Sequence, residues 1–149
     1  MYISRGQVVI SYTGADEKGH FEGSTDIAIE SLPGGATIRR LFNIPSVPVP
    51  SIKIGGSELN QSISNNEGVT FLECEMGAGE LSPMHVTPSI DFGIMISGEI
   101  VLILDSGEER TLKPGDIYVQ KAANHAWENR TSEPARFGAI MVAARAEKE

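Results

Sequence analysis

The feature that most constrains the fold of this chain is a series of short runs that are either apolar or alternate between apolar and polar residues. Glycine or proline ends each run. No stretch shows a sustained helical period with helix caps at its ends. Runs typical of β-strands cover residues 8–10, 69–76, 94–104, 117–119 and 137–142. Several strands at short spacing, with turn residues between them, indicate a sandwich or a barrel. We therefore expect an all-β fold.

Two turns in the second half of the chain are specified by their residues. Residues 99–104 and 108–112 are predicted to form a hairpin around residues 105–107, because Gly107 can adopt a positive φ at little cost. Residues 113–116, Lys-Pro-Gly-Asp, are predicted to form a second tight turn.

The first half of the chain is less regular. Residues 44–50 contain three prolines, each of which removes a backbone donor, so this segment cannot be a central strand. We expect it to run extended over the surface or along a subunit boundary. No linker divides the chain, so we expect one domain over residues 1–149, with an N-terminal extension at 1–65 and a barrel core at 69–143.

Charge and cysteine content exclude several classes of protein. The 149 residues carry a formal net charge of −8, which would repel a phosphate backbone, so we expect no nucleic-acid partner. No apolar run approaches the ~20 residues of a membrane helix, and the start of the chain lacks the pattern of a secretory signal. The single cysteine, Cys74, excludes an internal disulfide and predicts a small buried side chain. We expect a cytoplasmic protein without membrane partners, in which Glu73 or Glu75, opposite Cys74, faces solvent.

Two of the three histidines lie in structured contexts with regular spacing around them. His20 belongs to a polar turn and is interpreted as a solvated loop residue. The spacing around the other two histidines follows two patterns, Gly79, His85, Thr87, Asp91, Gly98 and then Gly115, Gln120, Ala122, His125, Asn129.

These two patterns resemble the motifs of the cupin superfamily, G-x5-H-x-H-x3,4-E-x6-G and, loosely, G-x5-P-x-G-x2-H-x3-N. The chain resembles small single-domain cupins that have His-x-Thr-x3-Asp in the first motif. The resemblance implies a double-stranded β-helix, or jelly-roll barrel, with additional N-terminal strands. It also implies that His85, Asp91 and His125 hold one divalent metal, Zn, Fe, Mn, Ni or Co. The alternative is a metal-free cluster of hydrogen-bonding groups, because Thr87 replaces the second motif histidine.

The same residues suggest a catalytic pocket. Burial would push the pKa of Asp91 upward, toward the range of a general base, with His85 and His125 as its catalytic partners. His125 and Trp127 are two residues apart and share a face of a strand, and Thr87 would orient a substrate. The expected substrate-binding residues are therefore Thr87, Trp127, Met84, Phe92, Met95 and Tyr118.

The resemblance implies an enzyme that acts on a small polyketide-like, aromatic or unsaturated acid by proton transfer. Dehydration, decarboxylation, isomerisation and cyclisation all belong to this class. Two alternatives stay open: an Fe(II) dioxygenase with a two-histidine, one-carboxylate site, and a non-catalytic module that binds a small molecule. The resemblance also implies a homodimer built through N-terminal strands.

Overall fold

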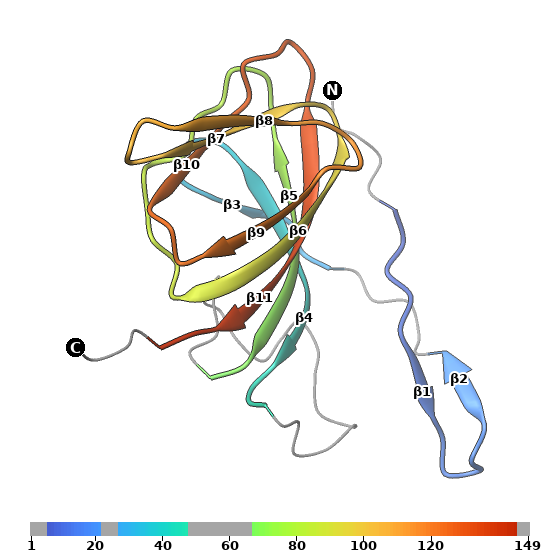
Figure 1. The fold of residues 1–149 in the computed structure, drawn as a ribbon. Helices are drawn as coiled ribbons and strands as arrows, with labels where there is room; N and C mark the ends of the chain where they lie inside the picture. Colours follow the sequence, from blue (N-terminus) through green and yellow to red (C-terminus); the bar gives the residue numbers. More distant parts are fainter. Residues whose placement is uncertain (1–5, 22–26, 48–66, 146–149) are drawn as a thin grey trace.

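The computed structural model describes residues 6–21, 27–47 and 67–145, and all regular elements in them are β-strands (Figure 1). No helix long and apolar enough to span a membrane occurs within these three ranges. In chain order, the strands are β1 (Ser11–Thr13), β2 (Gly19–Phe21), β3 (Glu30–Ser31), β4 (Thr37–Ile44), β5 (Val69–Met76), β6 (Ser89–Ser97), β7 (Ile100–Leu104), β8 (Glu109–Leu112), β9 (Ile117–Lys121), β10 (His125–Glu128) and β11 (Ala135–Ala143).

Two antiparallel sheets enclose the core. The larger sheet has the order β3-β4-β5-β11-β6-β9, and the smaller one has the order β10-β7-β8. Side chains from both sheets meet in one apolar cluster, to which β4 contributes Ile38, β7 contributes Ile100 and β10 contributes Trp127. The expected all-β architecture is confirmed.

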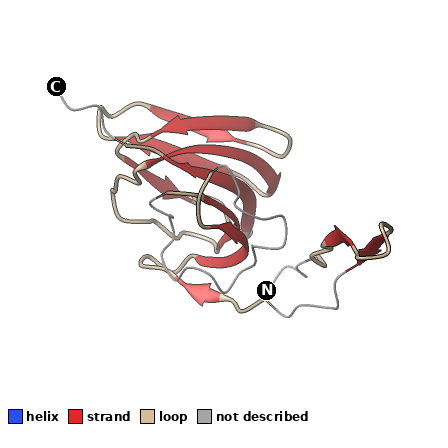
Figure 2. Ribbon diagram, turned by 90° about the horizontal axis from the view of Figure 1, so that it is seen from below, coloured by secondary structure: helices blue, strands red, loops and turns tan. Residues whose placement is uncertain are grey.

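A small hairpin, β1–β2, stands away from these two sheets (Figures 1 and 2). Every residue of both strands is exposed. The predicted strand at 8–10 is wrong, because these residues precede β1 without regular structure. The proline-rich segment continues from the end of β4, and its residues 48–50 lie outside the described part of the chain.

One predicted run forms two strands. Residues 94–104 are divided between β6 and β7 by Gly98, whose φ is +72°. A side chain at Gly98 would collide with the backbone of Pro134 and Ala135, so the turn requires glycine there. The β7–β8 hairpin forms as expected, with Gly107 at φ +88° donating its N–H to the Leu104 carbonyl over 3.0 Å.

The acidic residues on the outer side of β5 are less exposed than expected. Glu73 and Glu75 are both buried, with 6% and 7% of their surfaces exposed. Arg39 lies opposite Glu73 in β4, and its Nη2 is 2.7 Å from Glu73 Oε2. The prediction that one of these carboxylates faces solvent is wrong, and for Glu73 the reason is the cation that Arg39 supplies from the neighbouring strand. Cys74, which points to the other side, is buried as predicted.

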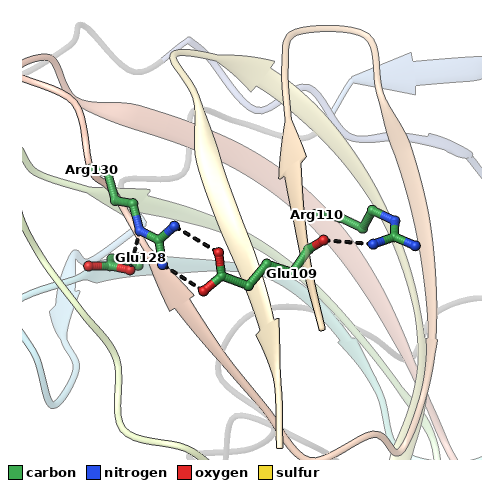
Figure 3. Close-up of polar contacts among 4 residues, drawn as sticks. All are labelled: Glu109, Arg110, Glu128 and Arg130. Atoms are coloured by element: carbon green, nitrogen blue, oxygen red, sulfur yellow. Dashed lines mark hydrogen bonds and ion pairs between the residues drawn. The ribbon is translucent and has the colours of Figure 1, made fainter. Parts of the chain in front are cut away.

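Figure 3 shows how Arg130 joins the smaller sheet to the residues that follow β10. Its guanidinium donates two parallel hydrogen bonds of 2.8 Å to the carboxylate of Glu109 in β8. A third bond, of 2.6 Å, goes to Glu128 at the end of β10. The hydrogen bonds from Arg130 hold the pKa of Glu109 below its usual value.

Candidate active site

A cavity of about 260 Å³ lies between the two sheets. Most of its lining is apolar and comes from β4, β5, β9, β10 and β11. The loop before β6 closes it with Ser82, Pro83 and His85, and the residues before β4 add Leu32 and Pro33. Its polar side chains include His85, Thr87, Asp91 and His125. Both motif histidines and the motif aspartate therefore reach one cavity.

His85 and His125 are held side by side by a local backbone bridge. The N–H of each residue donates to the carbonyl of the other, over 2.8 and 2.9 Å. Their rings lie 4.3 Å apart, centre to centre. His125 is buried, with 2% of its surface exposed, whereas His85 is exposed. His85 thus stands at the entrance of the cavity and His125 in its wall.

Both imidazoles are oriented by backbone carbonyls. His85 Nδ1 is 2.8 Å from the Pro83 carbonyl, and His125 Nδ1 is 2.8 Å from the Ala123 carbonyl. A carbonyl only accepts, so Nδ1 carries the hydrogen and Nε2 of a neutral ring keeps its lone pair. Burial lowers the pKa of His125, which favours this neutral form.

Asp91 lies on the inner side of β6 with 7% of its surface exposed. Burial raises its pKa, although hydrogen bonds from Ser89 and Gln120 oppose that shift. Gln120 is the cross-strand partner of Asp91 in β9, and its Nε2 is 3.1 Å from His125 Nε2. Because His125 Nε2 is an acceptor here, the amide of Gln120 donates to it. Gln120 therefore connects the carboxyl of Asp91 with the imidazole of His125.

Aromatic rings form the wall beside this polar group. Trp127 lies 4.9 Å from Phe137 and 5.1 Å from Tyr118, and 5.8 Å from His125, all measured between ring centres. His125 and Trp127 both line the cavity, as their spacing predicts. Burial and the nearby Asp91 raise the pKa of Tyr118, so its hydroxyl stays protonated.

Six of the predicted site residues reach the cavity, and three do not. Those that line it are His85, Thr87, Asp91, Tyr118, His125 and Trp127. The expectation is wrong for Met84, Phe92 and Met95 as lining residues. Asp91 points inward, so strand alternation turns Phe92 outward, where it is 48% exposed. Met84 is 43% exposed on its loop, and Met95 is packed in the core.

Sequence reasoning missed the roles of Ser89 and Gln120. Ser89 is two residues before Asp91 on the same face of β6, and its hydroxyl donates to the Asp91 carboxylate. Strand alternation could have identified Ser89. Gln120 was visible as a motif position, but its contact with His125 depends on how β9 pairs with β6.

Two imidazoles and a carboxylate have the chemistry of a divalent metal site. Their ligating atoms are engaged otherwise here, since His125 Nε2 accepts from Gln120 and Asp91 accepts from Ser89. Among the described residues, no three His, Cys, Asp or Glu side chains come together as a metal-binding group. This arrangement of the described residues does not fit a three-ligand metal centre.

Comparison with known proteins defines the family. Residues 72–143 match the family model of the Cupin domain. The polyketide cyclase RemF from Streptomyces resistomycificus superposes with a TM-score of 0.56 at 17% sequence identity, over 82% of this chain and 78% of that one. The fold is that of a cupin barrel. Residues 72–143 are therefore a cupin domain.

Its sequence relatives include proteins of biosynthesis clusters. Phomopsin biosynthesis cluster protein C' from Diaporthe leptostromiformis is 36% identical over 118 residues, which are 79% of this chain and 56% of that protein. The cupin-domain-containing oxidoreductase virC from Hypocrea virens is 49% identical over 61 residues, 41% of this chain and 31% of that protein. The chain therefore spans about half or less of the length of these relatives.

Proposed function

We propose that this cupin is an enzyme of secondary metabolism that transfers protons on a small, neutral, polyketide-like or aromatic substrate. The observation that carries the proposal is the buried pair Asp91 and His125, connected by Gln120 at the wall of an apolar cavity. Relatives that are named as proteins of biosynthesis clusters support the metabolic setting.

The cavity favours a neutral ring system. No lysine or arginine is among the described residues that line it, whereas Asp91 brings an acidic group, so a carboxylate substrate would find no cation among them. An apolar cavity of about 150 Å³ accommodates benzene. A volume of about 260 Å³ therefore suits a compound of one or two rings, stacked against Trp127 and Phe137.

The proton-transfer pair has complementary properties. Neutral His125 has a lone pair on Nε2, which can take a proton from a carbon beside a carbonyl once Gln120 yields its contact. Asp91, with its raised pKa, can hold a proton and give it to a departing hydroxyl, which leaves as water. Returning the proton to carbon instead would give an isomerisation.

Trp127 allows the proposed binding of a neutral ring compound to be measured directly. It is the only tryptophan of the chain and it lines the cavity, so its fluorescence reports occupancy. We expect saturable quenching by acetophenone and none by benzoate, which has a similar ring and a negative charge. The Asp91→Asn variant should reduce this discrimination, and Asp105→Asn, at the exposed β7–β8 turn, should leave it unchanged. Equal binding of both compounds by the wild type would contradict a neutral substrate.

Measurements of turnover test the proposed proton-transfer reaction. One- and two-ring β-hydroxy ketones should lose water in the presence of a chelator and under anaerobic conditions. Asp91→Asn and His125→Gln should each reduce kcat by at least about 100-fold, the scale of general acid–base catalysis. Activity that persists in both variants would exclude this pair as the catalytic group.

The second candidate is an oxidation–reduction reaction, favoured by the relatives that carry the name cupin-domain-containing oxidoreductase. Such an activity requires an electron acceptor, and a dioxygenase would consume O₂ in step with substrate. Oxygen uptake, together with activity that a chelator abolishes and one divalent metal restores, would replace the proton-transfer proposal with this one.

A further inference from the structure

The residues that line the cavity fall into two groups by their exposure to solvent. Those of the first group are buried and form the interior, whereas those of the second group are exposed or half-buried and mark where the cavity opens. We call the second group the rim: Leu32, Pro33, Ser82, Pro83, His85 and Thr87. The cavity therefore opens between two segments of the chain, residues 32–33 and residues 82–87.

The turn between β3 and β4 holds the first of these segments against the second. Gly34 in this turn has a φ of +89°, and a Cβ there would collide with the carbonyl of Leu81. Only glycine lets the two segments approach so closely. The N–H of Leu32 donates to the Ala36 carbonyl over 2.7 Å and closes the turn. The backbone of Leu32 is therefore held in place beside the opening.

Leu32 differs in chemistry from the other described residues of the rim. It has a long apolar side chain, whereas the others are prolines, hydroxyl-bearing residues and a histidine. This side chain is partly buried against the apolar core and also lines the cavity. It therefore narrows the opening from the first segment, while His85 borders the opening from the second. A substituent that a bound ring directs toward solvent would meet Leu32.

We propose that Leu32 is a specificity-determining residue, which limits the bulk of the substituent that a bound ring compound can carry toward the rim. This inference rests on the proposed function, because it takes the cavity as the binding site of a neutral ring. One additional methylene in an apolar pocket changes discrimination by about 10–200-fold, so a leucine side chain is large enough to set such a limit. The substrate is then a ring compound whose substituent at the rim is slender and unbranched.

Quenching of Trp127 fluorescence by acetophenone and by 4-tert-butylacetophenone tests this assignment in the full chain. The two ketones share the ring and the carbonyl group and differ in one bulky, branched substituent. The wild type should bind acetophenone more tightly than the larger ketone. Leu32→Ala should shift the ratio of the two dissociation constants toward the larger ketone by at least about tenfold. Leu32→Phe should shift this ratio in the opposite direction.

Leu112→Ala is the matched control for Leu32→Ala. Leu112, like Leu32, is partly buried against the apolar core, but it does not line the cavity. Both alanine variants lose packing and should unfold at a lower temperature than the wild type. Only Leu32→Ala should change the ratio of the two dissociation constants, because only that substitution enlarges the opening.

Two results separate this inference from the proposed function on which it rests. A ratio that Leu32→Ala leaves unchanged, or that Leu112→Ala changes equally, would overturn the role of Leu32, while binding of acetophenone would still support a site for a neutral ring. Absence of quenching by either ketone, in the wild type and in every variant, would overturn both.

Discussion

At the scale of single residues, the burial of Asp91 makes the stability of the protein depend on pH. Its pKa is raised from 3.8, so the fold favours the protonated form. The stability that this group contributes is complete below pH 3.8 and is lost as pH rises through the raised pKa. Asp91→Asn should therefore become more stable relative to the wild type as pH increases from about 4 to about 8. Urea unfolding at several pH values measures this difference, and a difference independent of pH would contradict it.

The contribution of His125 to stability depends on pH in the opposite direction. Burial lowers its pKa from 6.5, so its contribution to stability is present above pH 6.5 and is lost as pH falls through the lowered pKa. Nitrogen-15 NMR of the imidazoles should show His125 neutral, with hydrogen on Nδ1, at pH 6.5. A midpoint of titration at or above pH 6.5 would be inconsistent with this site.

Ala122 adopts a conformation that suits glycine. Its φ is +47°, in the left-handed region, while its N–H donates to the Ser89 carbonyl over 3.0 Å. A non-glycine residue there costs about 1–2 kcal/mol, and glycine has a larger unfolded-state entropy that offsets part of the gain. Ala122→Gly should therefore stabilise the protein by about 0.5–1 kcal/mol and raise Tm by about 2–3 °C. Ala123→Gly is the control and should not stabilise.

At the scale of the elements, Gly93 sets the position of the aromatic wall. It pairs with Tyr118 across β6 and β9, and a Cβ on Gly93 would overlap the Tyr118 ring. Gly93→Ala should displace that ring from Trp127, lower stability by about 1–3 kcal/mol and shift Trp127 emission. Gly138→Ala, in the adjacent strand, would place its Cβ 3.7 Å from the nearest atom and is the tolerated control. An equal loss of stability in both variants would argue against the role of Tyr118.

Arg130 connects β8 and the end of β10 from a solvent-exposed position (Figure 3). Exposed ion pairs contribute little and are screened by salt, although this one is bidentate. Arg130→Ala should reduce Tm slightly at about 0.05 M NaCl, and the reduction should shrink at about 0.5 M. A large loss of stability that salt does not change would show a structural role beyond the ion pairs.

At the scale of the whole molecule, the N-terminal hairpin and the barrel should behave differently. A two-stranded hairpin is marginally stable by itself, and β1 and β2 are exposed throughout. Trypsin should therefore cleave at exposed Lys18 well before Arg40, which is 7% exposed in β4. Mass spectrometry of the early fragments tests this, and cleavage at Arg40 first would contradict it.

The sequence by itself determined the all-β class, several strands and two turns, because period-two alternation and turn residues act locally. Strand β5 was predicted with its observed bounds, 69–76. Strand β4 was missed in the first half of the chain, because its stability comes from pairing with β5 and not from its own pattern. Motif spacing also identified His85, Asp91 and His125, all of which reach the cavity.

Only the tertiary structure decided how those residues are used. The backbone bridge between His85 and His125, and the pairing of Asp91 with Gln120, depend on contacts between distant segments. The sequence could not place Phe92 outside and Tyr118 inside without knowing which face of each strand meets the core. The burial of Glu73 likewise depended on Arg39 in the neighbouring strand. Local pattern specifies alternation along a strand, whereas sheet pairing and closure decide which side becomes the cavity and which becomes the surface.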